Sequence, residues 1–151
     1  MEPFKVCNIL KPKTKEEIIK NLSELSHNEL NDIFIKYSEL HNECVVMLLI
    51  DLGVDINYTG QSSITSLHYM TNYNKINACK KLINAGANIN TQENSGWTAL
   101  HYAALENNID IVKLLLNNNA NKNIQNNSGK IPLHLTTNPY IIDLLNNNES
   151  K

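Results

Sequence analysis

Pairs of apolar residues recur along the chain at a constant spacing of 33 residues. One series of pairs is Leu49-Ile50, Leu82-Ile83 and Leu115-Leu116. A second series with the same spacing is Leu67-His68, Leu100-His101 and Leu133-His134. Several series in one register indicate repeated units, each too apolar to be stable alone and therefore stacked on its neighbours.

The unit at 93–125 predicts two helices joined by a tight loop. Thr98 is a natural N-cap for a short helix over 99–104, which holds small and apolar residues. A second helix is expected over 109–116, where most residues are apolar. In the preceding unit, Gly86 stands where the second helix ends and where a residue with positive φ is expected.

A turn-helix-helix unit of this length with Gly-Trp-Thr-Ala-Leu-His-Tyr-Ala-Ala at 96–104 resembles the ankyrin repeat. The family motif, Gly-x-Thr-Pro-Leu-His-x-Ala-Ala, is matched best in the unit at 93–125. It is matched more loosely at 60–92, where Ser63 replaces the turn glycine. The resemblance covers roughly residues 27–148. It implies an all-α solenoid of stacked antiparallel helix pairs with short connections similar to β-hairpins.

The two ends of the chain depart from the motif and are expected to cover the stack. Terminal units with a polar outer face keep a repeat stack soluble. The expected divisions are an N-terminal tail and capping helix (1–26), a degenerate repeat (27–59), two repeats (60–92 and 93–125), and a truncated repeat with a polar tail (126–151).

Composition and charge narrow the classes of partner. The 13 basic residues, all of them Lys, are balanced by 15 acidic residues, for a net charge of −2. This balance argues against nucleic-acid binding and against attachment to an anionic membrane. No apolar run approaches the ~18 residues of a membrane helix, and the N-terminus does not resemble a signal peptide.

Cysteine usage predicts a reducing compartment. The three cysteines are odd in number and form no Cys-x-x-Cys pair, so we expect neither a disulfide framework nor a zinc site. The protein is expected to be intracellular and cytoplasmic, with the cytoplasm or nucleus of a host cell as the alternative. No cofactor, metal or small-molecule substrate is expected.

The histidines at the 33-residue spacing invite a catalytic interpretation, but a structural one is favoured. An enzyme that uses His68, His101 or a cysteine needs a cluster of titratable groups in one pocket, and the sequence offers only regular spacing. The resemblance implies that the motif residues make structural hydrogen bonds between turn and helix. The residues assigned to the structural motif are Thr65, His68, Gly86, Thr98, His101 and His134.

A column of asparagines has two interpretations. Asn57, Asn90 and Asn123 each follow the turn after a second helix. An asparagine there can cap backbone groups of its turn. The resemblance adds a second interpretation, because asparaginyl hydroxylases modify many ankyrin proteins at this position.

The resemblance also implies an inner, concave face, made of the turn tips and the exposed side of each first helix, that contacts a partner. Trp and Tyr dominate protein–protein hot spots, and four of the nine aromatic residues fall at these positions. At least one tyrosine, Tyr69 or Tyr102, is equally compatible with packing on a neighbouring unit. The candidate protein-binding residues are Ile64, Tyr69, Tyr73, Asn94, Trp97, Tyr102, Leu105, Glu106 and Lys130.

These observations predict a non-enzymatic module that binds one or more partner proteins, acting as a monomer. Because repeats occupy almost the whole sequence, a host-directed blocker is expected, similar to the small ankyrin proteins of viruses and intracellular bacteria. The alternatives are an inhibitor of a transcription factor that resembles IκB, or an adaptor that recruits other machinery. Binding of single-stranded nucleic acid on stacked rings is disfavoured, because Lys130 is the lone cation among the candidate positions.

Overall fold

The computed structural model of the protein describes residues 15–60 and 62–146. The secondary-structure elements of this part of the chain are all helices. It contains eight α-helices and one 3₁₀ helix. The helices are α2 (Lys15–Ser23), α3 (His27–Glu39), α4 (Glu43–Asp51), α5 (Ser66–Asn72), α6 (Ile76–Asn84), α7 (Ala99–Leu105), α8 (Ile109–Asn117), η1 (Pro132–Leu135) and α9 (Pro139–Asn146). The all-α repeat solenoid predicted from the sequence is confirmed.

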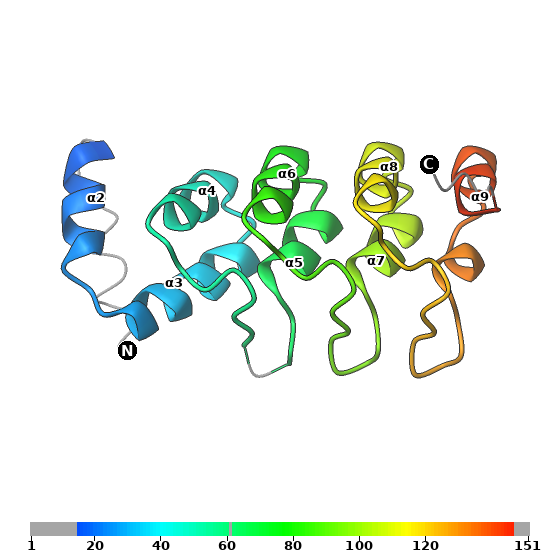
Figure 1. The fold of residues 1–151 in the computed structure, drawn as a ribbon, viewed down its shortest axis with the longest axis horizontal. Coiled ribbons are helices and arrows are strands. Elements are labelled where there is room, and N and C mark those ends of the chain that lie inside the picture. The colour runs from blue at the N-terminus through cyan, green and yellow to red at the C-terminus, as the bar shows by residue number, and fades with distance from the viewer. Residues whose placement is uncertain (1–14, 61, 147–151) are drawn as a thin grey trace.

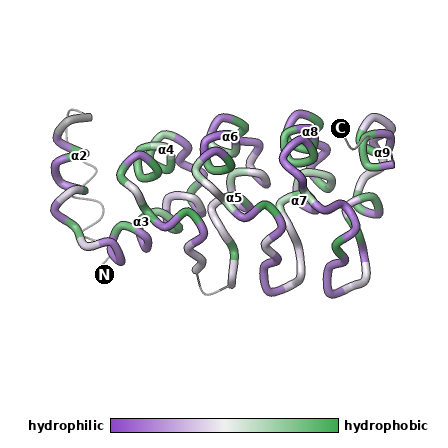
Figure 2. The backbone as a smooth tube through the Cα atoms, in the orientation of Figure 1, coloured by the Kyte–Doolittle hydropathy of each residue, from purple (hydrophilic) through white to green (hydrophobic). Residues whose placement is uncertain are grey.

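The helices form two rows along the long axis of the molecule (Figure 1). The first helices of the units, α3, α5, α7 and η1, make one row, and the second helices, α4, α6, α8 and α9, make the other. Long loops project from the row of first helices, and α2 stands at the N-terminal end of the stack. Figure 2 shows that hydrophobic stretches fall within the helix pairs, whereas much of the loop trace is hydrophilic.

Left-handed residues end the first helices at a regular spacing. His41, Asn74 and Asn107 have φ values of 46°, 54° and 56°. They lie just after α3, α5 and α7, and each is followed within two residues by the start of the second helix. Asn adopts this conformation at lower energy than most residues with a Cβ atom. Asn74 and Asn107 therefore suit the tight loop within their helix pairs.

The core consists of columns of fully buried side chains, one member from each unit. Val46, Cys79 and Val112 form one column, and Leu49, Leu82 and Leu115 form a second. Small residues of α7, such as Ala103 and Ala104, are also fully buried and let the neighbouring helices approach closely. At the N-terminal end Leu22 and Phe34 are fully buried in the same core.

The C-terminal unit is shorter than the others, and its first helix is a 3₁₀ helix rather than an α-helix. The chain becomes extended at Thr136, whose hydroxyl donates to Asn107 Oδ1 at 2.8 Å. Asn138 Oδ1 then accepts the backbone N–H of Tyr140, which starts α9 as its Asn-Pro sequence predicts. The predicted tails over 1–14 and 147–151 lie outside the described residues.

Shortening a side chain of the core column will destabilise the whole stack. Leu115 is fully buried between α8 and its neighbours, so Leu115→Ala leaves a cavity that rigid helix packing fills poorly. We expect a loss of ~2–5 kcal/mol in the free energy of unfolding, measured by urea titration. The exposed variant Asp110→Ala on the same helix should change it by less than ~1 kcal/mol.

Candidate functional site

The loops between units are held side by side by their backbones. The N–H of Asn94 donates to the carbonyl of Ser62 at 3.2 Å, and the N–H of Asn127 donates to that of Ser95 at 3.0 Å. Gly96 makes this approach feasible, since its φ is +79° and a Cβ there would lie 2.6 Å from Asn127 Oδ1. The three loops therefore form one continuous edge instead of independent flexible tips.

Each of the last two loops is also organised by one buried acceptor side chain. The Glu93 carboxylate accepts the backbone N–H groups of Ser95 and Trp97, both at 3.0 Å. Asn126, 33 residues later, accepts those of Ser128 and Lys130 through Oδ1. The sequence analysis missed these two residues, although their spacing and shared acceptor chemistry could have indicated them.

His68 and His101 join each first helix to the next loop. Nδ1 of His101 accepts the backbone N–H of Thr98 at 3.1 Å and lies 2.8 Å from the Thr98 hydroxyl. Because Nδ1 is an acceptor, Nε2 carries the proton and donates to the carbonyl of Lys130 at 3.0 Å. His68 and Thr65 make the equivalent set, with Nε2 3.1 Å from the carbonyl of Thr91 and 3.2 Å from that of Trp97.

His134 occupies the same column but is exposed. Ile131 replaces the threonine, so the hydroxyl partner is lost, and only the backbone N–H of Ile131 reaches Nδ1, at 3.3 Å. The prediction treated the three histidines as equivalent, and this equivalence is wrong. The unit at the end of the stack keeps the helix cap but not the buried environment.

Asn57 and Asn90 connect successive units, which differs from the local turn capping expected. Asn57 Oδ1 accepts the N–H of Asn88 at 2.8 Å, and its Nδ2 donates to the carbonyl of Gly86 at 3.3 Å. In the same way, Asn90 Oδ1 accepts the N–H of Asn121 at 2.7 Å. Asn123, near the end of the unit at 93–125, is exposed, as Asn57 and Asn90 are. Gly86 has the predicted positive φ, 93°, and presents its carbonyl to Asn57.

The predicted binding residues lie on the loops and on the open side of the first helices. Tyr73 and Leu105 are 42% and 43% exposed, which is high for large apolar side chains. Asn94, Glu106 and Lys130 are also exposed. Four further residues are half-buried: Ile64, Tyr69, Trp97 and Tyr102. We call this surface the inner face.

Aromatic rings on the inner face contact one another within the unit at 93–125 and across its boundary with the preceding unit. The Trp97 ring lies 5.2 Å from that of Tyr102 and 5.9 Å from that of His101, measured between centroids. Tyr102 also meets His68 of the preceding unit edge-on at 5.9 Å. Trp97 was predicted only as a binding residue, but these contacts also give its ring a folding role, since such pairs add about 0.5–1.5 kcal/mol.

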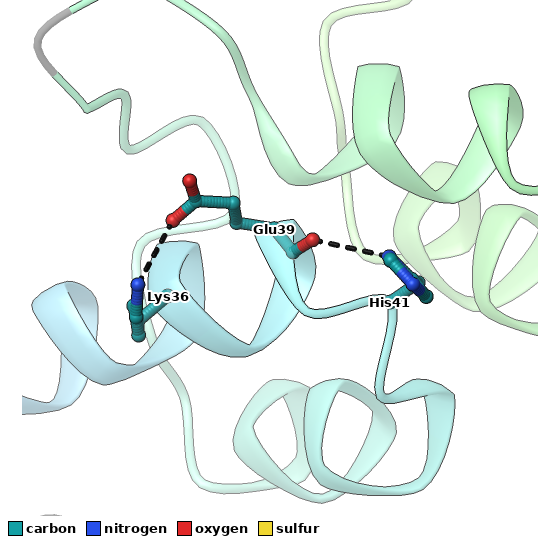
Figure 3. A network of polar contacts seen from close by, with 3 residues as sticks. All are labelled: Lys36, Glu39 and His41. Carbon is teal, nitrogen blue, oxygen red and sulfur yellow. Dashed lines mark hydrogen bonds and ion pairs between the residues drawn. The ribbon is translucent and has the colours of Figure 1, made fainter.

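The inner face extends onto α3, which the sequence analysis did not include. Leu40 is 52% exposed, and the ring of His41 stacks on that of Tyr73 with centroids 3.8 Å apart. Figure 3 shows Glu39 with its carboxylate 3.3 Å from Lys36 Nζ and its carbonyl 3.1 Å from His41 Nδ1. Subtracting 33 from Tyr69, Asn72 and Tyr73 would have identified Lys36, Glu39 and Leu40.

Two hollows are present on the described surface. A pocket of about 80 Å³ on the inner face is lined by Ile64, His68, Tyr69, Asn72, Tyr73 and Tyr102. A wider groove of about 430 Å³ between α8 and α9 is lined by Ile109, Lys113, Tyr140, Asp143 and Leu144. The first hollow coincides with predicted binding residues, and the second involves none of them.

The His, Cys, Asp and Glu side chains of the described residues bear on metal and thiol chemistry. Residues 15–60 and 62–146 contain no group of three or more His, Cys, Asp or Glu side chains that could hold a metal ion. Burial raises the pKa of the Cys79 thiol to about 12, so it stays protonated at neutral pH. Within this part of the chain, no helix is both long and apolar enough to span a membrane.

Comparison with known families places the chain among the ankyrin repeat proteins. The model for ankyrin repeats (3 copies) matches residues 33–126 and 67–148, well over half of the sequence. The chain therefore belongs to the ankyrin repeat family, whose repeats are protein–protein interaction modules and non-catalytic scaffolds. No curated protein matches it.

Folding stability should decrease in mild acid because of the two buried histidines. Burial lowers the pKa of His68 and His101 below the ordinary value of 6.5, which outweighs the opposing effect of their bonds to backbone carbonyls. The unfolded chain therefore binds these protons at higher pH than the folded protein does. The stabilisation by the neutral rings of His68 and His101 is therefore fully present above pH 6.5. The free energy of unfolding decreases as the pH falls through 6.5 toward the pKa values of the folded protein.

Urea unfolding at a series of pH values from 7.5 to 5 measures this loss. His101→Gln, which cannot titrate, should be less stable at pH 7.5 but should show a shallower decline. His134→Gln, at the equivalent position of the last unit, is the matched control for the substitution itself, because this ring is exposed. An identical decline in wild-type protein and in His101→Gln would contradict the assignment for that histidine.

Proposed function

We propose that this protein binds a single partner protein through the inner face, and that it acts by covering the surface it binds. The observation that carries the proposal is the strip of exposed apolar and aromatic side chains along successive first helices. Its most exposed members are Leu40, Tyr73 and Leu105. These residues lie outside the core columns, so recognition, rather than stacking, accounts for their exposure.

The preorganisation of the strip supports the proposal. The loops are joined backbone to backbone, and His68 and His101 fasten them to the helices. A surface that is already ordered loses little conformational entropy when a partner binds. Rigid aromatic anchors such as Trp97 and Tyr102 add contact area with few rotatable bonds.

The finer proposal is a host-directed blocker that works as a monomer inside the cell. Cys44 and Cys79 are free thiols, which suits a reducing compartment. Inhibition of a transcription factor in the manner of IκB, and recruitment of other machinery, remain the alternative consequences of the same binding step. Competition assays with the identified partner distinguish them, because a blocker displaces a natural ligand and an adaptor does not.

Truncating Trp97 should weaken both partner binding and folding, with the larger loss in binding. With the partner captured from a lysate and then produced in pure form, Trp97→Ala should weaken binding by about 2 kcal/mol or more, measured by calorimetry. Its folding cost should approach the upper end of about 0.5–1.5 kcal/mol, because the indole also contacts Tyr102 and His101.

Leu105→Ala provides a cleaner separation of binding from folding. Its side chain is largely exposed, so we expect an unchanged free energy of unfolding, within ~0.5 kcal/mol, and weaker binding by more than ~1 kcal/mol. Tyr140→Ala on α9 is the control, since this 72% exposed tyrosine is not part of the inner face. Weaker binding by Tyr140→Ala, with Leu105→Ala unaffected, would contradict the proposal.

A separate proposal concerns modification of the asparagine column. We propose that Asn57 and Asn90 are accepted by an asparaginyl hydroxylase, with Asn123 as a further acceptor. The side-chain amides of Asn57 and Asn90 are both hydrogen-bonded to the next unit, so modification requires local opening of that turn. After co-expression with the hydroxylase, mass spectrometry should find +16 Da on peptides with Asn57 or Asn90, and unmodified peptides would contradict it.

A further inference from the structure

The small pocket of the inner face has walls composed largely of tyrosine. Tyr69 and Tyr73 belong to α5 and its C-cap, and Tyr102 belongs to α7, so the pocket spans two successive units. Its volume of about 80 Å³ equals the space of two or three water molecules. This is room for the end of one side chain and not for a peptide segment.

Two carboxylates outside the lining of the pocket act electrostatically on its tyrosines. Burial, and next to it the negative charge of Glu39, raises the pKa of the Tyr69 hydroxyl. Burial and the negative charge of Glu93 raise the pKa of Tyr102 in the same way. Lys36 pairs with Glu39, but both side chains are more than half exposed, and such a surface pair is weak enough to be exchanged. No Lys is among the residues that line the pocket.

We propose that this tyrosine pocket receives an arginine side chain of the partner protein. The inference rests on the proposed function, because the arginine is supplied by the protein bound on the inner face. Aromatic faces attract cations, and the negative charges of Glu39 and Glu93, which act on Tyr69 and Tyr102, add to the attraction. A guanidinium is planar and weakly hydrated, and its donors can reach the amide of Asn72. An ammonium, which is strongly hydrated, gains less from such walls.

The composition of the chain itself excludes a second copy as the source of this group. All 13 of its basic residues are Lys, so no arginine is present in the sequence. The partner that fills the pocket is therefore a different protein. A preference of the pocket for guanidinium over ammonium therefore tests the chemistry of the pocket. It also tests whether the partner is a different protein, because this chain offers only ammonium groups.

The test compares two isosteric probes by NMR with uniformly labelled protein. Nα-acetyl-arginine methylamide carries the cation, and the citrulline derivative replaces the guanidinium with a neutral urea of the same shape. The arginine probe should shift the signals of Tyr69, Tyr73 and Tyr102 saturably. The citrulline probe should bind at least about fivefold more weakly, as expected for loss of the cation–aromatic attraction.

Variants then locate the site. Tyr73→Leu should weaken the arginine probe about threefold or more, whereas Tyr140→Leu, a tyrosine on α9, should leave its affinity unchanged. Glu39→Gln should weaken it about twofold and make its affinity less sensitive to salt. Both inner-face residues are exposed, so the variants should fold, which the thermal midpoint verifies.

Three results would overturn the inference. They are equal affinity of the arginine and citrulline probes, affinity of a third probe, Nα-acetyl-lysine methylamide, that equals or exceeds that of the arginine probe, and unchanged affinity of the arginine probe for Tyr73→Leu. Failure here remains separate from failure of the proposed function. If Leu105→Ala abolishes partner capture while the arginine probe does not bind, the inner face is the binding surface and the arginine pocket is wrong.

Discussion

Each helix pair of this protein depends on its neighbours, because it cannot bury its apolar residues by itself. The columns through Val46, Cys79 and Val112 and through Leu49, Leu82 and Leu115 are completed only when units lie next to each other. The hydrophobic contribution to stability is therefore shared across boundaries between units. Removing one member affects the units on both sides, which gives the elongated stack its cooperative behaviour.

Polar groups make the stacking specific in register. His68 and His101 reach the next loop, Asn57 and Asn90 reach the next turn, and Glu43 Oε1 accepts the N–H of Ala78 in the following unit. A shift between units would leave the buried His68 and His101 and the half-buried Glu43 without partners, which is costly in free energy. The apolar columns therefore favour stacking in general, and the hydrogen bonds select one arrangement.

The same bonds hold together the inner face, the surface that we propose to bind a partner. Loops that would be mobile tips in isolation form a continuous edge, and the rings of Trp97, Tyr102 and His68 are held in contact with one another. The series weakens at the C-terminal end, where Ile131 replaces the threonine and His134 is exposed. The units at 60–92 and 93–125 therefore have the fuller set of hydrogen bonds between helix and loop, and they hold both Trp97 and the tyrosine pocket.

The sequence by itself determined the repeat length, the helix pairs and the core columns, because burial acts on residue type at a fixed period. It also identified most of the inner face, since those positions follow from the register. Only the tertiary structure showed that Asn57 bonds to the next unit, that Glu93 is a buried loop acceptor, and that α3 adds Leu40 and His41 to the surface. It also showed that the indole of Trp97 is shared between folding and surface. These features depend on where two units meet, which distances along the chain do not specify.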